Sequence, residues 1–148
     1  MTIALIDDQL LWAVLRGQPP RVLASKELYT TGCWYVRLCQ AVLGARARTG
    51  VLSGPFVDLP DEMRNRALVA VLELPDDIGL LSLCELGPAI AQLRQGHPLN
   101  ILSIEALAAA THLQANVYLS ATSPQLEQAL RSAKLSVKVK PPPGRSRS

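Results

Sequence analysis

Short, mainly apolar runs separate longer stretches in which apolar residues recur every three to four positions. The first run, residues 2–6, has the length and aliphatic composition of a buried strand. In residues 7–16, leucines and a valine return at helical spacing, and Gly17 and the Pro19–Pro20 pair end the pattern. The chain is therefore predicted to open with a strand that leads directly into a helix.

The same pattern predicts five further helices and two further strands. One helix is expected within residues 27–45, with a start as late as Thr31 because β-branched residues and a glycine weaken its first part. Residues 56–59 fit either a short strand or an extended segment. The other expected elements are helices over residues 60–72, 82–95, 103–114 and 124–133, and strands over residues 116–120 and 135–139.

Polar residues at the expected helix starts mark where two of these helices begin. Ser82 and Glu85 have the spacing of a capping box, and Ser103 is the expected cap of an Ala-rich helix. Pro88 falls inside residues 82–95, so that helix is expected either to kink or to restart there.

The order of the elements favours an α/β protein. Strands that alternate with helices predict a parallel sheet with helices on both faces. The length of 148 residues suits one domain, predicted over residues 1–140. Residues 141–148, Pro-Pro-Pro-Gly-Arg-Ser-Arg-Ser, fit neither a helix nor a central strand and are predicted to be a disordered basic tail.

Composition narrows the class of protein. Hydrophobic residues make up 49% of the chain and aromatic residues 4%, so the core is predicted to be aliphatic. Neither a membrane-length apolar run nor a signal peptide is evident, and we expect a cytoplasmic protein with no membrane partner. The cysteines Cys33, Cys39 and Cys84 lack zinc-site spacing and are expected to be buried free thiols.

The net charge of +3 is concentrated at the C-terminus. Without the last four basic residues the remainder carries 3 − 4 = −1. The folded body is therefore not expected to be a general nucleic-acid-binding surface. The tail is either a solvated segment or a contact for RNA, DNA or an acidic partner.

Acidic residues mark the candidate site. Asp7 and Asp8 directly follow the first predicted strand, and open α/β sheets bind ligands at the carboxyl ends of their strands. Glu105 begins the Ala-rich stretch far downstream and is placed to face the same crevice. Carboxylates that converge in this way suggest a divalent cation and phosphate chemistry. All three acids also suit helix starts, where the helix dipole favours negative charge.

Several segments resemble the PIN domain. The run LIDDQLL (residues 5–11) is similar to its opening strand, acid and helix, and LNILSIEALAAA (residues 99–110) is similar to its late acid and Ala-rich helix. NVYLS (residues 116–120) resembles the last core strand, and residues 125–139 resemble the closing helix and strand. Length and element order also resemble the VapC-type toxins of bacterial toxin–antitoxin pairs.

The resemblance implies a PIN-like three-layer α/β/α fold and a metal-dependent endoribonuclease. Asp7 and Glu105 then match catalytic acids that bind Mg²⁺ or Mn²⁺, with Asp8 beside them. The acid expected after the last core strand is replaced by Thr122 and Ser123, whose hydroxyls are candidate metal contacts. The resemblance further implies RNA as substrate, a small antitoxin protein as inhibitor, and a homodimer.

Two departures from the PIN pattern support an alternative. The stretch that matches the early acidic helix, residues 29–45, contains no acid, and no carboxylate follows the last core strand. A catalytically inactive PIN-like module that binds RNA or protein is therefore the second hypothesis. A helix-rich interaction protein with no PIN relationship is a third, which a structure without a parallel sheet would favour. The candidate phosphate-binding rim, which is equally consistent with a solvated helix face, consists of Arg46, Arg48, Arg64 and Arg66.

Overall fold

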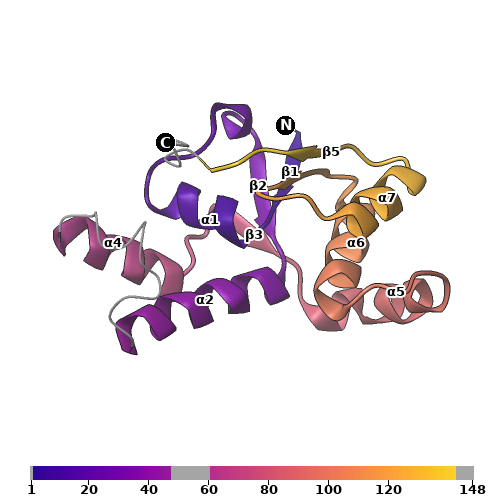
Figure 1. Cartoon of the computed structure of the whole chain (residues 1–148), viewed down its shortest axis with the longest axis horizontal. Coiled ribbons are helices and arrows are strands. Elements are labelled where there is room, and N and C mark those ends of the chain that lie inside the picture. Colours follow the sequence, from indigo (N-terminus) through magenta and orange to yellow (C-terminus); the bar gives the residue numbers. More distant parts are fainter. Residues whose placement is uncertain (1, 48–60, 143–148) are drawn as a thin grey trace.

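A five-stranded sheet forms the centre of the molecule (Figure 1). The computed structural model of the chain describes residues 2–47 and 61–142. The strand order is β3-β2-β1-β4-β5, and every adjacent pair is parallel. The strands are β1 (Ile3–Ile6), β2 (Glu27–Thr30), β3 (Ile78–Leu80), β4 (Asn116–Leu119) and β5 (Val137–Val139). All carboxyl ends therefore lie at one edge of the sheet, and β1 occupies the middle.

Helices cover both faces of this sheet. They are α1 (Asp8–Leu15), α2 (Gly32–Ala47), α4 (Asp61–Leu72), α5 (Leu83–Gly96), α6 (Ile101–Leu113) and α7 (Pro124–Ser132), with a short 3₁₀ turn at Arg21–Leu23. Alternate residues of β1 belong to different apolar clusters: Leu5 packs with α5, α6 and α7, whereas Ala4 and Ile6 pack with α1, α2 and α4. The predicted three-layer α/β/α fold with a central parallel sheet is confirmed.

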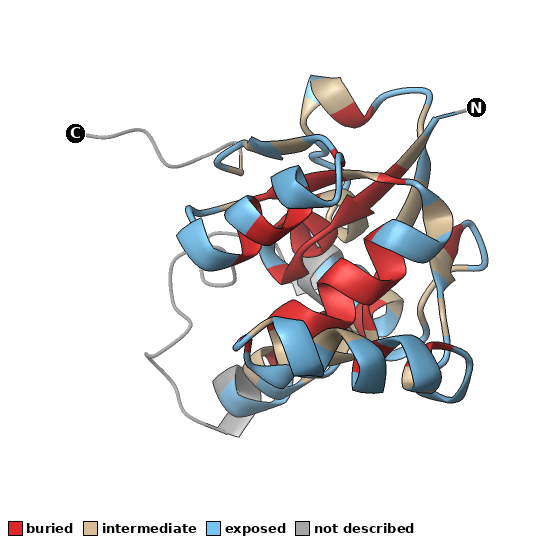
Figure 2. Ribbon diagram, turned by 90° about the vertical axis from the view of Figure 1, so that its right-hand side faces the viewer, coloured by how far each residue is buried: buried red, intermediate tan, exposed pale blue. Residues whose placement is uncertain are grey.

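Burial explains why β1 and α6 are so apolar. Ala4, Leu5 and Ile6 are fully buried because β1 has a strand on each side and a helix layer on each face. Every residue from 103 to 110 of α6 is also buried. A helix without a polar face is typical of a helix enclosed by protein. Figure 2 shows buried residues concentrated in the interior and exposed residues on the outer sides of the helices.

Two strands were not expected from the sequence. Glu27–Thr30, assigned to the start of a helix, forms β2 and pairs with β1, and α2 begins only at Gly32. Ile78–Leu80, read as a lead-in to a helix, forms β3. A three- or four-residue strand carries too little pattern to be separated from a helix start. Within β3, Gly79 is required because a Cβ there would collide with the Tyr29 ring of β2.

The caps were predicted with mixed success. The Ser82 hydroxyl accepts from the Glu85 N–H at 3.1 Å, as the capping-box spacing predicts. Ser103 is not the cap of α6: Asn100 fills that position and accepts from the Ser103 N–H at 2.9 Å. The chain remains helical through Pro88, so α5 does not restart there.

Other expectations concern cysteines, membranes and the chain segments outside the described residues. All three cysteines are unpaired, but Cys84 is exposed and Cys33 and Cys39 are half-buried, so the expectation of buried thiols was wrong. Within the described residues, none of the helices combines the length and apolar character that crossing a membrane requires. The expected segment 56–59 and residues 143–148 of the predicted tail lie outside the described residues.

Candidate functional site

A pocket of about 270 Å³ opens at the carboxyl ends of the two central strands, β1 and β4. This is the edge at which parallel α/β sheets bind their ligands. Asp7 and Asp8 line it from the end of β1, and the loop after β4 lines it with the consecutive residues 120–123. Its other walls come from α2 and α6 and include Trp34, Arg37 and Ser103.

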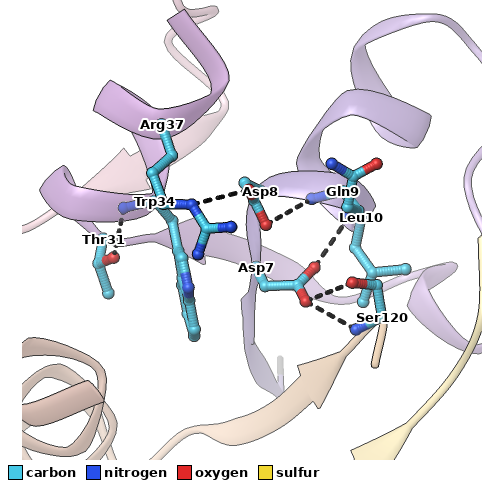
Figure 3. Close-up of polar contacts among 8 residues, drawn as sticks. All are labelled: Asp7, Asp8, Gln9, Leu10, Thr31, Trp34, Arg37 and Ser120. Atoms are coloured by element: carbon cyan, nitrogen blue, oxygen red, sulfur yellow. Dashed lines mark hydrogen bonds and ion pairs between the residues drawn. The ribbon is translucent and has the colours of Figure 1, made fainter. Parts of the chain in front are cut away.

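Asp7 joins the ends of β1 and β4 (Figure 3). Its Oδ2 accepts from the Ser120 hydroxyl at 2.6 Å and from the Ser120 N–H at 2.7 Å. Its Oδ1 accepts from the Leu10 N–H at 3.1 Å, so the same side chain is the N-cap of α1. The capping role predicted for this residue is confirmed. Three protein donors thus hold the carboxylate in place.

Burial makes the Asp7 carboxylate unusual. The residue is only 7% exposed, and loss of hydration raises the pKa of Asp7 above its ordinary value. The hydrogen bonds from Ser120 and Leu10 stabilise the charged form and oppose this rise in pKa, while neighbouring Asp8 adds to it. The burial effect is the largest of these contributions, so the folded protein holds a proton on Asp7 more tightly than the unfolded chain does.

Asp8 lies in the first turn of α1 and forms an ion pair with α2. Its Oδ1 accepts from the Gln9 N–H at 3.0 Å, and its Oδ2 lies 3.6 Å from the Arg37 Nε. The Arg37 side chain is 58% exposed, whereas that of Asp8 is 12% exposed. Figure 3 shows the guanidinium reaching across from α2. The contact is long and its arginine is exposed to solvent, so we expect it to be weak and sensitive to salt.

Glu105 lies elsewhere in the structure. The described lining of the pocket does not include it. The residue is completely buried, and its Oε1 accepts from the Cys33 N–H at 2.7 Å, near the N-terminus of α2. Among the described residues, Oε2 has no hydrogen-bond partner, and a Cβ at Gly32 would lie 3.3 Å from it. Glu105 therefore supports the start of α2, a role that its position in sequence did not suggest.

The Cys33 thiol shares this buried environment with Glu105. Burial raises the pKa of the Cys33 thiol, and the nearby Glu105 carboxylate raises it further by its charge and by accepting a hydrogen bond. Both effects favour the protonated thiol over the thiolate. Because the thiolate is the nucleophile, this pairing makes Cys33 a poor candidate for covalent chemistry.

The structure brings only some of the predicted metal ligands together. Asp7, Asp8, Thr122 and Ser123 line the pocket, and Glu105 does not. Within residues 2–47 and 61–142, no three histidine, cysteine, aspartate or glutamate side chains form a metal-binding group. Divalent Mg²⁺ and Mn²⁺ need several oxygen ligands, and the Asp7 oxygens are already engaged by three donors. This arrangement does not fit such an ion, and Mg²⁺ or Mn²⁺ binding stays a prediction.

The predicted arginine rim is only partly described. Arg66 is exposed on α4. Arg46 and Arg64 belong to α2 and α4, but their side chains lie outside the described set, as does the whole of Arg48. Among the described side chains, the arginine that reaches the pocket is Arg37. An RNA-binding role for the four predicted arginines stays a prediction.

Sequence reasoning missed three residues of the site: Ser120, Arg37 and Trp34. Ser120 had a usable signal, because it directly follows β4, and neighbouring parallel strands end at the same edge. Trp34 is a core residue, 3% exposed, that also lines the pocket. No sequence signal links Arg37 to Asp8, because their contact depends on how α2 crosses α1.

Comparisons with known proteins do not assign a family to this chain. A scan against models of protein families found no match, and a search of curated proteins found no significantly similar sequence.

Proposed function

We propose that this chain is a PIN-like binding module whose pocket holds a cationic group of a partner protein and does not cleave RNA. The support comes from the balance of donors and acceptors around Asp7 and Asp8. Four of the roughly eight lone-pair positions on these two carboxylates accept from protein donors. The positions that remain suit a positively charged hydrogen-bond donor.

The donors and acceptors around Asp7 and Asp8 also disfavour an RNA phosphate in the pocket. Backbone N–H groups that could otherwise bind an anion already donate to carboxylates. The Gln9, Leu10 and Ser120 N–H groups donate to Asp7 or Asp8. The Ser123 N–H donates to Glu127 at 2.8 Å. The lining carries two carboxylates against one guanidinium. A phosphate would therefore meet net negative charge with few free donors. By the PIN resemblance, the expected partner is a small antitoxin protein.

A direct binding experiment tests the proposal. N-acetyl-arginine amide and inorganic phosphate are titrated separately into isotopically labelled protein while the Ser120 amide resonance is followed. The arginine derivative should shift this resonance in a saturable way, and the Asp7→Asn/Asp8→Asn double variant should lose the response. The matched control Asp76→Asn/Asp77→Asn removes the same charge from exposed turn residues and should respond like the wild type. A shift caused by phosphate alone would refute the proposal.

A metal-dependent endoribonuclease is the second candidate, favoured by the position of Asp7 at the carboxyl end of the central strand and inside the pocket. Purified protein is incubated with structured RNA and Mg²⁺ or Mn²⁺, and Mn²⁺ binding is measured by calorimetry. The binding-module proposal expects neither cleavage nor binding at millimolar Mn²⁺. Cleavage that is lost in Asp7→Asn would establish the nuclease instead.

The homodimer is a separate proposal. Exposed apolar side chains on α2 and α4 offer a surface for it: Val36, Leu43, Val69 and Leu72 are each about half exposed. Sedimentation equilibrium of the wild type and of Leu43→Glu tests this surface, since a dimer that buries it should dissociate in the variant.

A further inference from the structure

One oxygen of the two pocket carboxylates differs from the other three. Asp7 Oδ1, Asp7 Oδ2 and Asp8 Oδ1 each accept at least one hydrogen bond from a backbone N–H group. Within the described residues, Asp8 Oδ2 instead faces the Nε of Arg37 at 3.6 Å (Figure 3). A cation that enters the pocket therefore finds its most open acceptor already beside a positive charge of the same chain.

The contact between Arg37 and Asp8 suits a group that can leave. Its length of 3.6 Å exceeds the roughly 2.7–2.9 Å of a charge-assisted hydrogen bond. The Arg37 side chain is 58% exposed, so water can hydrate the guanidinium as soon as it moves away. Asp8 is held by its own hydrogen bond from the Gln9 N–H, and its side chain is only 12% exposed. The arginine can therefore move while the carboxylate stays in place.

We propose that Arg37 is a gate on this pocket: in the free protein its guanidinium lies against Asp8, and the partner's cationic group must displace it in order to bind. This inference rests on the pocket of the proposed function and adds its regulation. Until the partner arrives, Arg37 supplies a charge for a carboxylate that is largely shielded from water, and a shielded charge is costly without a partner. On binding, one positive charge replaces another beside Asp8.

The effect of this gate on affinity can be bounded. Surface ion pairs favour contact over separation by a factor of about five at most. A ligand that binds only the open form loses affinity in proportion to the open fraction, hence by up to about sixfold. Removing the guanidinium should restore this affinity, because the described lining then carries two carboxylates and no arginine. We expect Arg37→Gln to bind a cationic ligand roughly three- to sixfold more tightly than the wild type.

Two resonances of isotopically labelled full-length protein test the gate. The Ser120 amide reports on the pocket, and the Arg37 Nε–H group, identified by its absence from Arg37→Gln, reports on the gate. Asp8→Asn gives the position of the released Arg37 resonance. Unlabelled N-acetyl-arginine amide should move the wild-type Nε–H toward that position as the Ser120 amide shifts. The matched control Arg94→Gln removes an arginine charge from an exposed position on α5, outside the described lining, and should bind like the wild type.

The outcomes separate the gate from the proposed function. Binding that shifts the Ser120 amide but leaves the Arg37 Nε–H unmoved overturns the gate and leaves the cation pocket standing. Equal or weaker binding to Arg37→Gln overturns the gate as well, and so does an Arg37 resonance that is identical in wild type and Asp8→Asn. No binding to any of these proteins overturns both proposals. Coupled movement of the two resonances, with tighter binding to Arg37→Gln that the Arg94→Gln control does not share, supports the gate.

Discussion

Replacing Ser120 with alanine removes the shortest contact that Asp7 makes, the hydroxyl hydrogen bond at 2.6 Å. The Ser120 and Leu10 N–H donors remain, so the carboxylate keeps its position. A hydrogen bond to a charged group contributes roughly 1.5–3 kcal/mol. Since Ser120 is half-buried and water can replace part of the contact, we expect the lower half of that range, about 1.5–2 kcal/mol.

The penalty for Ser120→Ala should depend on pH. Burial raises the pKa of Asp7, so the folded state binds its proton more tightly than the unfolded chain, and wild-type stability falls as pH rises from the ordinary aspartate pKa through the raised one. The Ser120 hydroxyl favours the ionised form and limits this fall. Without it, the pKa of Asp7 rises further. The difference between wild type and variant is therefore smallest in acid and largest above the Asp7 pKa.

Urea unfolding at several pH values from 3 to 8 measures both effects. Near neutral pH, a loss of about 1.5–2 kcal/mol corresponds to a melting temperature lower by roughly 3–8 °C for a chain of this size. Ser123→Ala is the matched control, because Ser123 lines the same pocket but its side chain makes no capping hydrogen bond. A Ser120→Ala penalty below about 0.5 kcal/mol at pH 7, or one that is constant with pH, would refute the reasoning.

Three further predictions concern the remaining acids. Glu105→Ala should lower the free energy of unfolding by about 2–4 kcal/mol because it leaves a cavity and an unpaired Cys33 N–H. Glu105→Gln keeps a hydrogen-bond acceptor for this N–H and should cost less than half as much. Urea unfolding of both variants checks this prediction. Gly32→Ala should cost roughly 1 kcal/mol, since its Cβ would crowd the buried Glu105 carboxylate, which the Cys33 N–H holds through its other oxygen, and a melting temperature no lower than wild type would contradict the crowding. Asp8→Asn should change stability by less than about 1 kcal/mol, and the difference should shrink in 1 M NaCl because the ion pair with Arg37 is long and the guanidinium is exposed.

Local pattern was sufficient for much of the fold. The helical spacing after the first strand, the Gly17 stop and the apolar run at residues 116–120 each led to an element that the structure contains. β2 and β3 were missed because a short strand owes its conformation to its neighbours: Glu27–Thr30 is extended because it pairs with β1, and the same residues read alone fit a helix start.

In the candidate site, too, some positions could be predicted from local sequence and others could not. Asp7 and Asp8 were placed correctly at the end of the central strand, because a strand followed at once by a helix fixes both positions. Glu105 was expected to face the same crevice, but the helix starts at Ile101 instead of Ser103, and its carboxylate meets the Cys33 N–H. The side that Glu105 faces is set by how α6 packs against α2, and the sequence carried no signal for that packing.

The sequence by itself determined the α/β class, the position of the first two acids and the aliphatic core, because each depends on residues that are neighbours along the chain. The tertiary structure decided which of those residues meet. It joined Asp7 to Ser120, paired Asp8 with Arg37 and buried Glu105 under the start of α2. These contacts join residues 29 to 113 positions apart, and their geometry follows from how strands align and helices cross, which no local pattern encodes.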